Sequence, residues 1–176
     1  MKDLRPKGDY LLLLDVSSFL HRAYHALPRL TRQSDGLQTG ALYGMANSML
    51  KLLRLNWTAI GRLPTYAAFV MDHRGKNWRH ELYPAYKANR PSYDQDLLDQ
   101  IPYLPIIAEA FRVKTICIPG FEADDCIATY CNMADIEGLD VVVASSDKDL
   151  MQLVGIGDDG GSTIMYDGLK DKGPQD

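Results

Sequence analysis

The stretch that decides the fold opens on Gly120-Phe121-Glu122-Ala123-Asp124-Asp125 and closes on Ser145-Ser146-Asp147-Lys148-Asp149. Between these two acidic clusters, the pattern predicts a helix over about residues 123–137. An apolar strand over residues 139–144 follows Gly138 and ends at the second cluster. The two clusters therefore flank one helix–strand unit, which is typical of an α/β protein.

Two further apolar runs are each followed at once by an acid, because residues 10–14 lead into Asp15 and residues 65–71 lead into Asp72. Parallel strands deliver their carboxyl ends to one edge of a sheet, where ligands bind, so these acids can converge with the two clusters. Crowded carboxylates repel one another unless cations lie among them. Oxygen ligands of this kind suit Mg²⁺ or Mn²⁺, and two such ions about 4 Å apart assist phosphodiester hydrolysis. The pattern predicts metal-assisted phosphoryl transfer to water.

A structural explanation exists for each acid taken alone. Asp and Glu at the start of a helix accept hydrogen bonds from free N–H groups and complement the helix dipole. The recurrence of acids after four strands favours a functional site instead. Helix capping alone does not require Asp125 behind Asp124, or Asp149 behind Asp147.

The length and composition are those of one globular domain, with 176 residues, of which 46% are hydrophobic and 24% charged. No apolar run reaches the length of a membrane span, and the N-terminus lacks a signal-peptide core, so we expect a cytoplasmic protein without a membrane partner. The three cysteines are expected to be reduced and buried. His21 and His25 have the spacing of zinc ligands on a helix, but no third ligand lies nearby in the sequence.

A basic segment follows the strand that ends at Asp72. Between residues 74 and 90 there are five Lys and Arg residues against Glu81 alone, and aromatic residues are interspersed among them. Cations for phosphates and flat rings for bases are typical of a surface that binds single-stranded nucleic acid. The alternative is a solvated loop with long side chains lying along the surface.

The remaining segments provide the scaffold. We expect helices over residues 17–26 and 39–55, and a third over 93–111 that is kinked or broken at Pro102 and Pro105. Further strands are expected over 113–118 and 163–166. No internal repeat or linker divides the chain, so residues 1–176 are predicted to form one domain.

Several motifs in a fixed order carry a resemblance to a known family. They are Leu14-Asp15, Arg22-Ala23-Tyr24-His25-Ala26, Gly40-Ala41-Leu42-Tyr43-Gly44, Phe69-Val70-Met71-Asp72, Arg79-His80-Glu81, Tyr86-Lys87-Ala88-Asn89-Arg90-Pro91, Gly120 to Asp125, and Asp147 to Leu153. Over nearly its whole length, the chain resembles the 5′–3′ exonuclease or flap endonuclease family, which includes the 5′-nuclease domain of bacterial DNA polymerase I.

The resemblance implies an α/β fold of the three-layer, PIN-like type, with a central, mostly parallel sheet between helices. It implies cleavage of DNA near 5′ ends or flaps in replication and repair, with two Mg²⁺ or Mn²⁺ ions. The implied metal ligands are Asp15, Asp72, Glu122, Asp124, Asp125, Asp147 and Asp149. A helical arch at about residues 73–100 would receive the 5′ strand. Lys87 and Arg90 would act there on the phosphate, with Tyr86, Arg79 and Arg22 as supporting DNA contacts.

Two features depart from the family pattern. Ser145-Ser146 stands where the family has Thr-Gly or Thr-Ala, and small residues are kept. The sequence ends at Gly173-Pro174-Gln175-Asp176, before the helix–three-turn–helix part and a further aspartate pair that the family carries. The alternative function is therefore a shortened relative that binds DNA but needs a partner segment, such as a C-terminal domain or a polymerase, to cut. A phosphatase of the haloacid-dehalogenase type is a weaker alternative, because it needs an Asp where this chain has Ser17.

Overall fold

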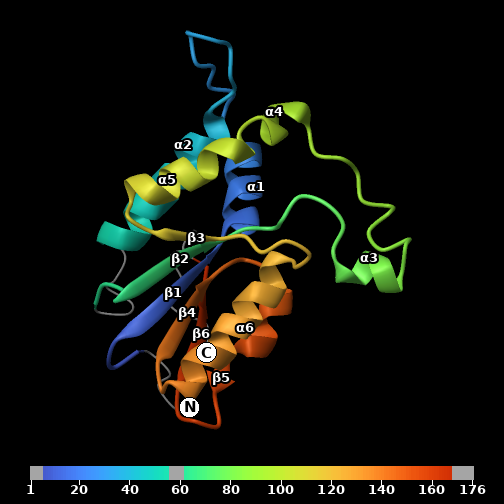
Figure 1. Cartoon of the computed structure of the whole chain (residues 1–176). Coiled ribbons are helices and arrows are strands. Elements are labelled where there is room, and N and C mark those ends of the chain that lie inside the picture. The colour runs from blue at the N-terminus through green and yellow to red at the C-terminus, as the bar shows by residue number, and fades with distance from the viewer. Residues whose placement is uncertain (1–5, 56–61, 168–176) are drawn as a thin grey trace.

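The computed structural model describes residues 6–55 and 62–167, which are arranged around one six-stranded sheet (Figure 1). The strand order in the sheet is β3-β2-β1-β4-β6-β5. In chain order, the elements are β1 (Tyr10–Asp15), α1 (Val16–Ala26), α2 (Gly40–Leu50), the π-helical turn η1 (Lys51–Leu55), β2 (Tyr66–Val70), α3 (Trp78–Leu82), α4 (Gln95–Leu98), the 3₁₀ turn η2 (Ile101–Tyr103), α5 (Leu104–Ala110), β3 (Lys114–Ile116), α6 (Ala123–Ile136), β4 (Asp140–Ala144), the 3₁₀ helix η3 (Lys148–Leu153), β5 (Gly155–Ile156) and β6 (Ser162–Tyr166).

The central strand β1 is parallel to both of its neighbours, β2 and β4. Leu14 lies opposite Phe69 of β2 and opposite Ala144 of β4, so the three strands end at nearly the same level. The pairs β2–β3 and β4–β6 are also parallel, and only the short β5 runs antiparallel to its neighbour among the described strands. The predicted mostly parallel sheet is therefore confirmed, and its carboxyl edge is level enough to hold one site.

Two apolar clusters cover the two faces of the sheet. Leu12 and Leu14 of β1 belong to one cluster with residues of α1, α2 and α5, and Leu13 belongs to the other with residues of α6. Successive strand residues point to opposite faces, which explains this division. Figure 1 shows α1, α2 and α5 on one side of the sheet and α6 on the other. The result is the predicted three-layer arrangement.

The helices α1 and α2 approach each other closely at Gly44. A Cβ atom on Gly44 would lie 2.5 Å from the Cβ of Ala23 and 2.8 Å from Leu27 Cδ1. Glycine at this position lets α2 pack directly on α1, and this contact fixes the helix that begins right after Asp15.

Several predicted boundaries need correction. The helix expected over 39–55 is α-helical only to Leu50 and continues as a π-helical turn. The expected break at the two prolines is confirmed, because Pro102 lies in the first turn of η2 and Pro105 in that of α5. The strand expected over 113–118 is limited to β3 at the sheet edge, and Cys117 beyond it is exposed rather than buried.

The segment between β2 and α5 contains two short helices, α3 and α4, with turns and extended chain between them. A helical arch was predicted at about residues 73–100. In the structure, most of this segment is not helical. Among the described residues, no helix is long and apolar enough to cross a membrane.

Candidate active site

A cavity of about 820 Å³ lies at the carboxyl edge of the sheet, where β1, β2 and β4 end. Five of the predicted metal ligands line it, namely Asp15, Asp72, Glu122, Asp124 and Asp147. Three of the predicted DNA contacts line the same cavity, namely Arg22, Lys87 and Arg90. The chain thus brings acids and cations from distant parts of the sequence to one place.

Asp15 is the most enclosed of these carboxylates, at 4% exposed. Its Oδ2 accepts a hydrogen bond from Ser145 Oγ at 2.6 Å, and its Oδ1 accepts one from the Ser18 backbone N–H at 3.3 Å. Burial raises the pKa of Asp15, and the two hydrogen bonds oppose that rise. Asp15 therefore both caps α1 and faces the cavity.

Asp72 links β2 to two helices. Its Oδ2 accepts from Ser17 Oγ at 2.7 Å, and its Oδ1 accepts from the backbone N–H of Ala123 at 2.8 Å. Ala123 is the first residue of α6, so the carboxylate satisfies a free N–H at the positive end of that helix. Asp72 therefore caps α6 as well as lining the cavity, a capping role that the sequence did not predict for this residue.

The pKa of Asp124 is raised by burial and by its position among the other carboxylates of the cavity. Burial, followed by the charges of Asp15, Asp147, Asp72 and Glu122, raises its pKa to about 6. Like charges that share a cavity disfavour ionisation of one another. The carboxylates therefore crowd each other enough to perturb titration, which is the condition that favours a bound cation.

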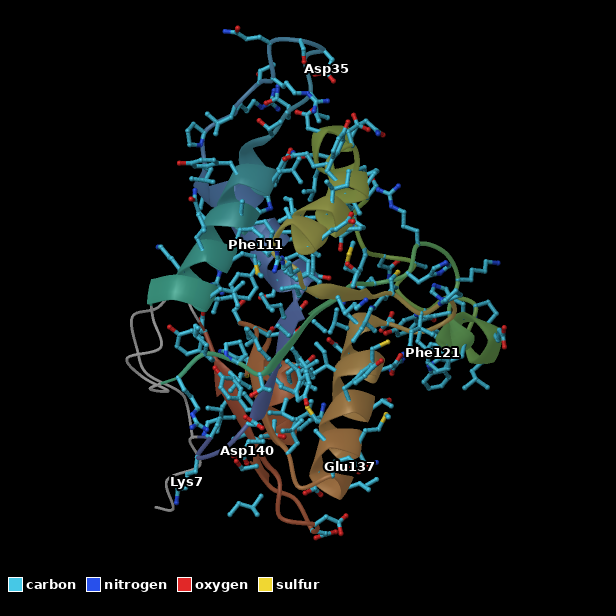
Figure 2. All side chains as sticks on the ribbon, turned by 60° about the vertical axis from the view of Figure 1, so that its left-hand side comes forward. Lys7, Asp35, Phe111, Phe121, Glu137 and Asp140 are labelled. Atoms are coloured by element: carbon cyan, nitrogen blue, oxygen red, sulfur yellow. The ribbon has the colours of Figure 1, made fainter. Side chains whose placement is uncertain are left out.

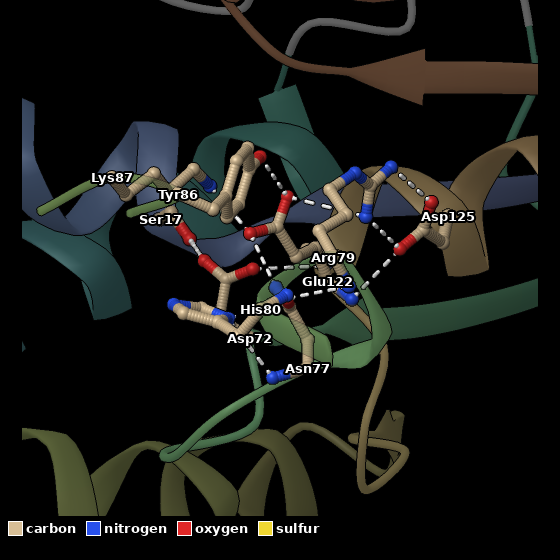
Figure 3. Close-up of polar contacts among 10 residues, drawn as sticks. Ser17, Asp72, Asn77, Arg79, His80, Tyr86, Lys87, Glu122 and Asp125 are labelled. Atoms are coloured by element: carbon tan, nitrogen blue, oxygen red, sulfur yellow. Dashed lines mark hydrogen bonds and ion pairs between the residues drawn. The ribbon is translucent and has the colours of Figure 1, made fainter. Parts of the chain in front are cut away.

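Glu122 is bound by the basic segment, as Figure 3 shows. Its Oε1 accepts from Lys87 Nζ at 2.6 Å and from Asn77 Nδ2 at 2.7 Å, while its Oε2 accepts from Tyr86 OH at 3.1 Å. Burial lowers the pKa of Lys87, but the hydrogen bond and the charge of Glu122 outweigh it and raise that pKa overall. The basic segment thus lies against the first acidic cluster.

Asp125 faces Arg79 rather than the cavity. Both of its oxygens accept from the Arg79 guanidinium, each at 2.7 Å, and this pair holds the pKa of Asp125 below its usual range. Asp125 Oδ2 also accepts from the backbone N–H of Glu122 at 3.0 Å, which completes a capping box. The Arg79 guanidinium lies over the Trp78 ring, 4.5 Å from its centroid. The structure therefore places these two predicted site residues in a pair that supports α6.

Two other predicted residues have partners of their own. The exposed Asp149 does not belong to the cavity lining, and its backbone N–H donates to Asp147 Oδ1 at 3.0 Å. Arg22 Nη1 donates to Asp167 Oδ1 at 2.7 Å, so its cation is partly engaged at the end of β6.

The helix α6 points its N-terminus toward the site. Figure 2 shows Phe121, just before α6, near the basic segment, and Glu137 at the other end of the helix. Helix N-termini carry partial positive charge, which stabilises the carboxylates of Asp72, Glu122 and Asp125 beside it. This charge accounts for how the fold tolerates so many acids at one edge.

The donor set fits a hard divalent cation in its chemistry. The lining carboxylates supply the oxygen ligands that Mg²⁺ and Mn²⁺ prefer, and burial together with the neighbouring carboxylates raises the pKa of Asp124. As the side chains lie, no three His, Cys, Asp or Glu residues in the described part of the chain form a group that could hold one ion. Ion binding would thus require carboxylates to turn from their present partners.

Three residues that organise the site could not be recognised from the sequence as part of it. Ser145 is fully buried, and its Oγ donates to Asp15 and accepts from the Asp147 N–H at 2.9 Å. Ser17 binds Asp72, and Asn77 caps α3 and binds Glu122. Only Asn77 carried a recognisable signal, because Asn before a helical run is a common N-cap.

The comparisons with known proteins show the family of the chain. Residues 10–172 match the family model described as "5'-3' exonuclease, N-terminal resolvase-like domain". The chain belongs to the 5′–3′ exonuclease family. The DNA polymerase I of Rhizobium leguminosarum is 47% identical over 167 residues, a match that covers 94% of this chain and 16% of that protein. The resemblance derived from the motifs is therefore confirmed, and this exonuclease-family chain spans about a sixth of its relative's length.

Solved structures support the same fold. The T5 D15 protein co-crystallised with metal ions has a TM-score of 0.61 at 20% identity, and the match covers 89% of this chain and 54% of that one. A bacteriophage T5 flap endonuclease complex with DNA and metal ions has a TM-score of 0.57 at 18% identity and covers the same 89%, with 54% of its own chain. The predicted PIN-like 5′-nuclease fold of this exonuclease-family chain is confirmed by these neighbours.

Proposed function

We propose that this chain is a metal-dependent nuclease domain that hydrolyses DNA phosphodiesters near 5′ ends or branch points, as a 5′–3′ exonuclease or flap endonuclease in replication and repair. The observation that carries the proposal is one cavity whose lining includes five predicted metal-binding carboxylates and three cations. A cavity lined only by acids would be expected to bind metal ions, and one lined only by cations would be expected to bind phosphate. Their combination fits phosphodiester hydrolysis.

The five predicted metal ligands in the lining would hold Mg²⁺ or Mn²⁺, and their number suits two ions. Asp125 and Asp149 would support them from outside the lining. Asp125 would do so through Arg79 and the Glu122 N–H, and Asp149 through the hydrogen bond to Asp147. Bound ions would stabilise the charge on the attacking and leaving oxygens of the phosphodiester.

The cations of the cavity would bind the DNA backbone. Lys87 is half-buried and Arg90 is exposed, and both line the cavity within reach of a phosphate placed among the carboxylates. Lys87 would exchange its ion pair with Glu122 for the phosphate when DNA enters. Tyr86 and Arg79 would flank the path, and Arg22 would contact a neighbouring phosphate.

A cleavage assay on a 5′-labelled flap duplex tests the proposal. The wild type should cut in Mg²⁺ or Mn²⁺ and not in EDTA, and Asp124→Ala should lose at least about 100-fold in rate, since removing charge stabilisation in an active site has this effect. Asp158→Ala, in an exposed loop away from the cavity, is the matched control and should cut normally.

The same samples distinguish the alternative function. The present side-chain arrangement, in which no described group of three acids is ready to hold an ion, is the observation that favours DNA binding without cutting. Wild-type chain that binds the flap duplex but leaves it intact in both metals would contradict the nuclease proposal and support the binding relative.

A further inference from the structure

Asn77 is a buried polar residue at the base of the basic segment, at 8% exposed. As the N-cap of α3, its Oδ1 accepts from the backbone N–H groups of Arg79 at 3.1 Å and His80 at 3.3 Å. Because a carboxylate can only accept, the amide must direct its N–H group at Glu122 while its oxygen caps the helix. Nδ2 donates to Glu122 Oε1 at 2.7 Å. One side chain thus joins α3 to the first acidic cluster.

The backbone supports the same junction. The Trp78 N–H donates to the Gly120 carbonyl at 3.2 Å, two residues before Glu122. Gly120 has φ +82, a left-handed conformation that glycine adopts readily. The start of α3 is therefore docked on the turn that leads into α6, and Asn77 acts from a fixed base.

Asn77 differs in charge from the two cations near Glu122, and the Tyr86 hydroxyl, which donates to Oε2 at 3.1 Å, is a second neutral donor. Lys87 and Arg79 also approach the carboxylate, at 2.6 Å and 3.5 Å, but both are cations that a phosphate would attract. A neutral amide has no such competitor and leaves the full negative charge of Glu122 in place. When Lys87 turns to DNA, Asn77 remains as the donor to Oε1, and Tyr86, itself one of the predicted DNA contacts, donates only to Oε2.

We propose that Asn77 is a positioning residue for Glu122, which holds the carboxylate at the cavity while Lys87 moves between Glu122 and the DNA phosphate. The inference deepens the proposed function and rests on it for the role of Lys87. Mutation of a residue that orients a metal-binding side chain through a hydrogen bond typically lowers metal affinity or activity by about 10- to 100-fold.

The test variant is Asn77→Ser, because serine caps a helix as well as asparagine but lacks the amide N–H that binds Glu122. On a flap duplex in Mg²⁺, kcat should fall about 10- to 100-fold, with little change in KM for DNA. Asn132→Ser, exposed on α6, is the matched control and should cut as the wild type does. A kcat equal to that of the control, or a rise in KM alone, would overturn the inference.

A second measurement does not depend on activity. Denaturant unfolding in EDTA compares wild type, Asn77→Ser, Glu122→Ala and the double variant. The destabilisation caused by Asn77→Ser should disappear in the Glu122→Ala background. An equal loss in both backgrounds would show that Asn77 only caps α3 and would overturn the inference. If the wild type cuts no DNA, the proposed function fails, and this cycle still decides whether Asn77 positions Glu122.

Discussion

At the scale of single residues, the site is a set of carboxylates whose repulsion is only partly compensated. Asp15 and Asp72 accept hydrogen bonds from serine hydroxyls and from N–H groups at helix starts. Asp124, by contrast, is exposed to the negative charges of four neighbouring carboxylates. The sequence identified Asp15 and Asp72 because each follows an apolar run, and Asp124 because it belongs to an acidic cluster. It could not identify Ser145 or Ser17, since a serine that binds a distant carboxylate leaves no local pattern.

Because the pKa of Asp124 is raised, we expect Asp124→Asn to increase thermal stability by an amount that depends on pH. A pKa raised from 3.8 to about 6 destabilises the folded chain fully above pH about 6, and this destabilisation disappears as the pH falls from about 6 to 3.8. In EDTA at pH 7.5, Asp124→Asn should raise Tm by up to about 2–4 °C, the effect of about 1 kcal/mol in a chain of this size. Solvent screening of the half-buried group makes this an upper limit.

Calorimetry at pH 7.5 and pH 4.5 measures that gain, which should shrink at the lower pH. Asp158→Asn in the exposed loop is the control and should show no gain. A Tm lowered by Asp124→Asn at both pH values would instead support a purely structural role for this acid.

We expect the Lys87 ammonium and a metal ion to compete for the carboxylate of Glu122. Its ammonium lies 2.6 Å from Glu122 Oε1, so a divalent cation must displace it or share the carboxylate. Lys87→Met should therefore tighten Mn²⁺ binding about two- to fivefold in the absence of DNA, which corresponds to an ion pair of less than about 1 kcal/mol. Electron paramagnetic resonance of free Mn²⁺ measures the affinity.

Lys114→Met, on the exposed edge strand β3, is the matched charge control for this experiment. It should leave Mn²⁺ affinity unchanged. An unchanged affinity for Lys87→Met as well would mean that the ion does not bind at Glu122.

At the scale of elements, the helices and strands that carry acids are predicted well because apolar periodicity and flanking glycine and proline mark them. The predicted helix over 123–137 and strand over 139–144 differ from α6 and β4 by about one residue at their ends. The basic segment was predicted by composition only. Its docking through Asn77, Tyr86 and Lys87 joins residues at least 35 positions apart, which no local pattern shows.

We expect the ion pair between Arg79 and Asp125 to hold α3 against α6. Arg79→Lys keeps the charge but removes the two parallel hydrogen bonds that the planar guanidinium makes. Amide hydrogen exchange in α3 should become faster, while Tm falls by only a few degrees because the pair is partly exposed. Exchange measured by mass spectrometry over residues 78–90 checks this.

Arg32→Lys is the matched control, because Arg32 makes a similar two-point contact with Asp35 far from α3 along the surface. It should leave exchange in α3 unchanged. Equal exchange in wild type and Arg79→Lys would show that Asn77 and the Trp78 N–H alone hold the helix.

The contact between α1 and α2 makes a further prediction. In Gly44→Ala, the new methyl would overlap Ala23 and force the helices apart, at a cost of about 1–3 kcal/mol. The gain in helix propensity of about 1 kcal/mol offsets part of this cost, so the net effect should be destabilising. Gly8→Ala, where a Cβ meets no atom within 4 Å, is the control for urea unfolding. A more stable Gly44→Ala chain would contradict the packing.

At the scale of the whole molecule, the topology explains why the site lies where it does. The parallel strands β1, β2 and β4 bring Asp15, Asp72 and Asp147 to one edge, and the crossover places the N-terminus of α6 there as well. The sequence predicted this convergence from strand ends alone. It could not predict that Asp125 turns to Arg79 instead of the cavity, because side-chain direction at a helix start depends on partners from other elements.

The most direct test of the account is a crystal structure of the chain soaked in Mn²⁺, with anomalous scattering to locate the ions. The account predicts anomalous peaks inside the cavity, with carboxylate oxygens of Asp15, Asp72, Asp124 or Asp147 within about 2.5 Å of an ion. Ions found only outside the cavity, in crystals of a chain that cuts DNA in Mn²⁺, would contradict the assignment of these carboxylates as the metal site.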